Sequence, residues 1–284
     1  MEFLTEPFEA EFVRTGALAA AVVGILCAVV GCYVVLRGMA LVADSLAHGV
    51  LPGIAIAFAL TAGAAGSDPN EAALFAGALI AGLITALGTD LILRRSRIRE
   101  EAAAGVVFVF MLALGVAIIS RTEGYTVDLN SFLFGDVLGV GGGEVALSAA
   151  LAAAVLALVA LCYRPLLLYS FDPQRAAALG LPVGRLQLLL LVLVTLAVVI
   201  GFRVVGALLV LGLLIAPPAT AILVTKRMPA MMAVSAAIAA ISAPLGLLLS
   251  WHLDLAAGAS IVLVAVGAFV VAILVRPAGA GARL

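Results

Sequence analysis

The chain is organised as long apolar segments separated by short polar connections. Each segment is rich in Leu, Ala and Val, and at about twenty residues it is long enough to cross a bilayer as a helix. Only helices and closed barrels satisfy all backbone hydrogen bonds inside lipid. Because the segments lack the period-two alternation of a barrel strand, we predict an all-α fold, a polytopic transmembrane helical bundle. The predicted segments are approximately 15–36, 39–62, 72–93, 102–119, 145–168, 186–202, 204–225, 229–250 and 257–275.

Prolines inside two of these segments set the predicted number of crossings at eight to nine. Pro217 and Pro218 fall within the seventh segment and Pro52 within the second. A proline inside a helix removes a backbone hydrogen bond and kinks or breaks the helix. One of the two segments is therefore a candidate for a broken or re-entrant element. Residues 1–284 are predicted to form a single transmembrane domain.

Composition and charge support a membrane protein and give its orientation. Hydrophobic residues make up 65% of the chain and charged residues 11%, whereas a soluble domain averages about 25% charged residues. Arginine and lysine in short loops mark the cytoplasmic side, and the densest cluster lies at 94–99, after the third segment. Nine crossings would place this cluster inside and the N-terminus outside. Because residues 1–14 are acidic, unlike a signal peptide, we expect the first segment to be retained.

Two connections are too long to be simple turns. The predicted external one covers residues 120–143. The predicted cytoplasmic one, at about 169–185, has the sequence YSFDPQRAAALGLPVGR. In it, Asp172 suits a helix N-cap, Pro173 a first helical position and Gly180 a C-terminal stop. We therefore predict one short helix in this loop, lying at the membrane surface.

The second segment contains a pair of ionisable residues, Asp44 and His48. Such residues inside a span are costly and usually functional. A spacing of four places both side chains on one helix face, about 6 Å apart along the axis. A carboxylate and an imidazole suit Zn²⁺, Mn²⁺ or Fe²⁺, so the two residues are predicted metal ligands. The alternatives are a pair that seals a helix contact, or a proton relay.

Other ionisable residues carry weaker signals. Asp90 is predicted to pair with the arginines that follow it, and Glu100 to sit at a helix N-terminus, where the helix dipole favours acids. His252 and Asp254 are predicted to lie in a solvated external turn. The cysteines form no CxxC motif and lie in apolar segments, which indicates small buried side chains.

The sequence contains no motif for chemistry of its own. It has no GxxxxGK[ST] phosphate-binding loop, no GxSxG or HExxH motif, and no Cys/His cluster. We therefore expect that the chain is not an enzyme, that it binds no cofactor, and that ATP, if used, is hydrolysed by another subunit.

Several blocks of sequence resemble the manganese/zinc/iron-type ABC importer permeases, from about residue 15 to 275. The most specific block is GCYVVLRGMALVADSLAHGVLPGIAIAF at 31–58. Further blocks similar to family segments are EEAAAGVVFVFMLALGV, SFLFGDVLGV, FDPQRAAALGLPVGR and RVVGALLVLGLLIAPPATA. The last also resembles the larger vitamin-B12/siderophore permeases, which implies a similar architecture.

The resemblance implies a permease subunit that imports a divalent metal, Zn²⁺, Mn²⁺ or Fe²⁺, across the bacterial cytoplasmic membrane. It implies a homodimer, a cytoplasmic ABC ATPase docking near Phe171 to Gly184, and an extracytoplasmic metal-binding protein; it implies no nucleic acid. The family's metal-path residues fall on Asp44 and His48. Alternatives are a proton-coupled secondary metal transporter and a siderophore or vitamin ABC permease. The sequence does not choose between the metals.

Overall fold

The computed structural model describes residues 7, 10–61, 71–96, 98–120 and 139–275. Within these ranges the regular structure is helical throughout, with no strand, so the predicted all-α fold is confirmed. The predicted external connection falls largely outside the described residues. The helices are α2 (Glu11–Arg37), α3 (Ala40–His48), α4 (Leu51–Thr61), α5 (Glu71–Arg95), α6 (Glu100–Ile119), α8 (Gly142–Leu161), α9 (Tyr163–Phe171), α10 (Pro173–Ala178), α11 (Val183–Val205), α12 (Ala207–Val224), α13 (Met228–Leu253) and α14 (Ala257–Val275).

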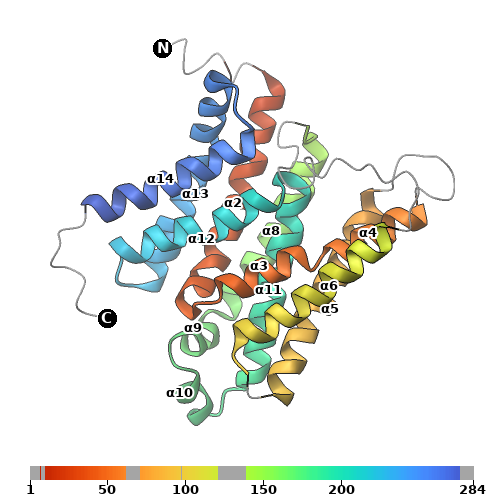
Figure 1. Ribbon diagram of the computed structural model, residues 1–284. Coiled ribbons are helices and arrows are strands. Elements are labelled where there is room, and N and C mark those ends of the chain that lie inside the picture. The colour runs from red at the N-terminus through yellow and green to blue at the C-terminus, as the bar shows by residue number, and fades with distance from the viewer. Residues whose placement is uncertain (1–6, 8–9, 62–70, 97, 121–138, 276–284) are drawn as a thin grey trace.

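Helices α2 and α11 lie at the centre of the bundle. Helix α2 packs against α8, α11, α12 and α13, and its side chains are buried on every face along most of its length. A helix buried all round is apolar all round, which fits the sequence of α2. Helices α12, α13 and α14 pack together on one side of this centre, and α3 to α6 form a group on the other (Figure 1).

Eight helical stretches of the described chain are long and apolar enough to cross a membrane. One of them combines α3 and α4, and α12 contributes a shorter apolar helix at Leu209–Val224. This matches the prediction of eight to nine crossings. The broken element is the second segment, which is interrupted at Gly49 and Val50, although α4 continues in about the direction of α3 (Figure 1).

Helix α12 runs without interruption through its two prolines. Pro218 has no N–H to donate to the carbonyl of Leu214, four residues earlier. That carbonyl packs directly against Gly31 of α2, where a Cβ atom would overlap it. Gly31 on α2 therefore leaves room for the free carbonyl of Leu214, and α12 stays a continuous helix.

A second close approach joins α4 to α5. A Cβ added at Gly53 would overlap the backbone carbonyl of Gly77, and a Cβ added at Gly77 would overlap that of Gly53. Small residues at such points let two helix backbones touch inside a membrane. This contact fixes α4, the second half of the broken span, onto α5.

Candidate metal site

Helix α3 carries both predicted metal ligands, and the structure brings their side chains together. The Nδ1 atom of His48 lies 3.5 Å from Oδ1 of Asp44, so the two residues share one face of the helix as predicted. The same nitrogen lies 3.1 Å from the backbone carbonyl oxygen of Asp44. A hydrogen bond from Nδ1–H to this carbonyl would leave the lone pair of Nε2 available to a metal, as in many metal-binding histidines.

His48 is the last residue of α3, directly before the break in the second span. The break packs onto α5, where the hydroxyl of Thr85 lies 2.8 Å from the carbonyl oxygen of Ala81 in its own helix and 3.3 Å from that of Gly49. A Cβ atom at Gly49 would collide with the Thr85 side chain, so this close approach of the two helices requires glycine at position 49. A hydroxyl from a neighbouring helix is a usual partner for backbone groups at an interrupted membrane helix.

Helix α6 packs against α3 and contacts the imidazole directly. The ring of Phe108 meets that of His48 edge to face, with 5.7 Å between the centroids and an interplanar angle of 87°. Side-chain exposure is 31% for His48 and 45% for Asp44. Phe108 therefore fixes one side of the imidazole, while both polar groups remain accessible from outside the chain.

The candidate site contains two potential ligands within the described part of one chain. In the described part of the protein, no group of three or more His, Cys, Asp or Glu side chains is arranged to hold a metal ion. Asp44 and His48 supply two ligands, whereas a tight transition-metal site has about four. A single chain thus brings together two candidate ligands, Asp44 and His48.

The short helix predicted in the loop at 169–185 is present as α10. The Oδ1 atom of Asp172 accepts a hydrogen bond of 2.9 Å from the backbone N–H of Arg175, and Pro173 occupies the first helical position. Gly180 has the left-handed conformation, with φ of 80°, just after the helix end. All three predicted end signals are confirmed. The structure adds a further helix, α9, immediately before α10.

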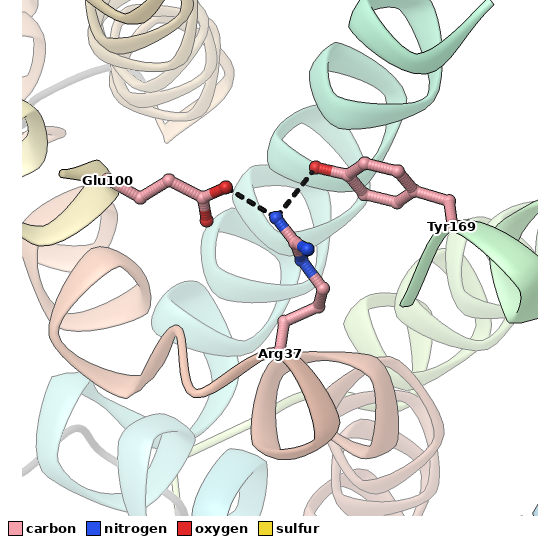
Figure 2. Close-up of polar contacts among 3 residues, drawn as sticks. All are labelled: Arg37, Glu100 and Tyr169. Atoms are coloured by element: carbon pink, nitrogen blue, oxygen red, sulfur yellow. Dashed lines mark hydrogen bonds and ion pairs between the residues drawn. The ribbon is translucent and has the colours of Figure 1, made fainter. Parts of the chain in front are cut away.

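Three residues far apart in sequence meet next to this short helix, and sequence reasoning missed their contact. Arg37, at the end of α2, forms an ion pair with Glu100, at the start of α6. The same Nη2 atom donates to the hydroxyl of Tyr169 in α9 at 3.1 Å (Figure 2). The Arg37 guanidinium also lies 4.5 Å from the centroid of the tyrosine ring. Glu100 is therefore an ion-pair partner as well as an acid at a helix N-terminus.

Burial shapes the electrostatics of this group. Burial raises the pKa of Tyr169 to about 12, an effect that the nearby Arg37 charge partly offsets. The phenol therefore stays protonated, as a neutral donor and acceptor, at any physiological pH. The Arg37 side chain is only 14% exposed, and burial of this kind strengthens its attraction to Glu100.

Asp90 forms the predicted ion pair with an arginine of the following turn. Its Oδ2 atom accepts from Nε of Arg94 at 2.6 Å, and Arg94 also donates to the carbonyl of Gly184 at 2.9 Å. This second contact ties the end of α5 to the start of α11. The loops predicted to be cytoplasmic thus meet at one end of the molecule, below α3 and beside α9 and α10 (Figure 1).

The remaining pair, His252 and Asp254, was only partly predicted. His252 belongs to the last turn of α13 rather than to a solvated loop. Asp254 follows it as the C-cap in the left-handed conformation, with φ of 50°. The prediction of a turn is correct for Asp254 and wrong for His252.

Comparison with known proteins decides the family. The family model described as the ABC 3 transport family matches residues 9–276. The chain belongs to this family. One relative of the chain is the manganese transport system membrane protein MntC of Halalkalibacterium halodurans. The two sequences are 40% identical, and the aligned region covers 97% of this chain and 91% of the relative. The chelated iron transport system membrane protein YfeD of Yersinia pestis is 35% identical, covering 95% and 88%.

Solved structures share the fold of this ABC 3 family member. PsaBC from Streptococcus pneumoniae, in complex with Fab, matches with a TM-score of 0.81 and 36% identity, covering 97% of this chain and 96% of the other. A metal-chelate type ABC transporter in an inward-facing conformation matches with a TM-score of 0.73 at 18% identity, a likeness of fold alone. The protein is a multi-pass protein of the bacterial inner membrane.

Proposed function

We propose that the chain is the membrane-spanning permease subunit of an ABC importer that moves a divalent transition metal ion into the cytoplasm. The family assignment and the names of relatives, which include manganese and chelated iron transport systems, support this function. The observation that carries the proposal is the Asp44–His48 pair on α3, at the break in a membrane span. No catalytic role is proposed for the chain itself.

The proposed metal path passes Asp44 and His48. A carboxylate and an imidazole suit Mn²⁺, Fe²⁺ and Zn²⁺, and they do not distinguish these ions. The accessibility of both side chains supports contact with a passing ion. Two ligands hold an ion weakly, and weak holding favours release, as conduction requires.

Completion of the site calls for a second copy of the chain. We propose a homodimer in which the two α3 helices face each other and supply four ligands. The half-site supports this arrangement, because in the described residues no third ligand comes from the same chain. Metal would then pass between the subunits.

We propose further that two partners act at opposite ends of the permease. A separate ATPase would dock on α10, near Phe171 to Gly184, where exposed side chains include Phe171 and Leu179. These two side chains are the apolar groups that we expect the ATPase to cover. An extracytoplasmic binding protein would deliver the ion near residues 121–143, of which 121–138 lie outside the described residues.

Metal uptake into liposomes tests the function. The complex of permease and ATPase would be reconstituted, supplied with metal-loaded binding protein, and assayed with Mn²⁺, Zn²⁺ and Fe²⁺ in turn. We expect ATP-dependent uptake that Asp44→Ala and His48→Ala abolish while the complex still assembles. Ser45→Ala is the matched control, because Ser45 lies between the two residues on α3, is buried, and donates its hydroxyl to the carbonyl of Leu41 in its own helix.

Two outcomes would contradict the proposal. Uptake that survives both substitutions would make Asp44 and His48 packing residues. Uptake that proceeds without ATP, driven by a pH gradient, would instead favour a proton-coupled secondary transporter.

A further inference from the structure

The contact of Arg37 with Glu100 and Tyr169 joins three separate elements. Arg37 ends α2, and the chain then turns sharply through Gly38, whose φ is 68°. The N–H of Met39 donates back to the carbonyl of Val34 at 2.9 Å, so the turn has a defined shape. The guanidinium is therefore held at the junction between α2 and α3.

Arg37 and its two partners each lie on a chain segment that leads directly to a functional element. From Arg37 the chain enters α3, where Asp44 and His48 lie about one and two helical turns after its first residue, Ala40. From Glu100 the chain continues in α6 to Phe108, two turns on, whose ring contacts His48. From Tyr169 the chain reaches Asp172, the N-cap of α10. The group thus links α10 to both helices that form the metal half-site.

The polar atoms of this region are not all paired. Nε of Arg37 and Oδ1 of Asp90 are buried, and neither has a hydrogen-bond partner in the described structure. Asp90 lies close enough for its charge to raise the pKa of the Tyr169 hydroxyl. A buried polar atom without a partner is costly and calls for an explanation. Here one such atom is a hydrogen-bond donor and the other an acceptor. Unpaired donors and acceptors of this kind allow a group to exchange hydrogen-bond partners between two arrangements.

We propose that Arg37, Glu100 and Tyr169 form a joint that transmits movement of α9 and α10 to α3 and α6, and so couples ATP hydrolysis to passage of the metal. This inference rests on the proposed function. The three are positioning residues, since none of them contacts the Asp44–His48 pair. Separating a buried guanidinium from its carboxylate is strongly unfavourable, so a displacement of Tyr169 would carry Arg37 and Glu100 with it.

The test measures metal transported per ATP hydrolysed in the full complex of permease, ATPase and binding protein, using Mn²⁺ as the probe. Glu100→Gln removes the charge of the ion pair, and Tyr169→Phe removes only the hydroxyl. Glu101→Gln is the matched control for the first, because Glu101 is the next residue of the same helix turn and is exposed. Tyr163→Phe is the control for the second, on the same helix α9.

We expect each joint variant to hydrolyse ATP while transporting less metal per ATP. The expected fall is about fivefold or more, the lower end of the usual range for coupling between two sites. The double variant should lose less than the product of the two single losses, since both act through Arg37. If Glu100→Gln does not assemble, Tyr169→Phe carries the test alone, because it removes a single oxygen atom.

A ratio of metal to ATP that stays equal to the controls in the assembled variants would overturn the inference and leave the group as a static contact. Failure of the proposed function gives a different result. In that case the wild-type complex itself would show no ATP-driven uptake of Mn²⁺, Zn²⁺ or Fe²⁺, and the inference would fall with it.

Discussion

Replacement of Gly77 by alanine tests the tight contact between α4 and α5. A Cβ at this position would overlap the carbonyl of Gly53 and lie 2.9 Å from the Cβ of Ala57. Both obstacles are rigid parts of α4, so the helices must separate. Overpacking of this kind costs about 1–3 kcal/mol, whereas alanine in place of glycine within a helix gains about 0.5–1 kcal/mol. We therefore expect a net loss of stability.

Gly88→Ala is the matched control on the same helix. A Cβ there would lie 3.6 Å from Val107, an ordinary van der Waals distance. Both variants gain the same helix propensity, so the difference between them isolates the steric cost, about 1–3 kcal/mol. At roughly 2–4 °C per kcal/mol for chains of 150–250 residues, thermal melting of the purified protein in detergent should separate them by several degrees, with Gly77→Ala the lower. Equal melting temperatures would refute the close approach of the two backbones.

Two further predictions concern α10 and the cysteines. Asp172→Ala removes the N-cap of α10, at a cost of about 1 kcal/mol, and should weaken binding of the ATPase in a pull-down titration. Asp172→Asn keeps a capping side chain and should bind the ATPase normally. Equal weakening by both variants would contradict the capping explanation. Cys162 is partly exposed at the junction of α8 and α9, whereas Cys27 and Cys32 are fully buried. N-ethylmaleimide should therefore label Cys162 first, as peptide mass spectrometry would show, and early labelling of Cys27 would contradict the packing of α2.

Features set by neighbouring residues were predictable from the sequence. Asp172, Pro173 and Gly180 act within one or two turns of α10, so their residue types were enough to predict its ends. The alignment of Asp44 with His48 follows from the helical repeat in the same way. The all-α fold followed from the length and apolar character of the segments, because lipid leaves few alternatives.

Features set by tertiary packing were not predictable. Glu100 is separated from Arg37 by 63 positions and Tyr169 by 132, and no local pattern indicates that they meet. By contrast, the break of the second span at Gly49 and Val50 follows the prediction from Pro52, because a proline ends a helix just before itself and is tolerated in the first turn of the next helix, here α4. Two adjacent prolines leave α12 intact because Gly31, on another helix, accommodates the carbonyl of Leu214.

These contacts place the Asp44–His48 pair on a helix that is interrupted at both ends. Gly31 fixes α2 to α12, and the contact of Gly53 with Gly77 fixes α4 to α5. Helix α3 lies between these two interlocked pairs, with the turn at Gly38 before it and the break at Gly49 after it. An importer must open to one side at a time, and α3 is an element that could change position while both pairs stay intact. In the proposed joint, a displacement of α9 would reach Asp44 and His48 through the Arg37 contact at one end of α3.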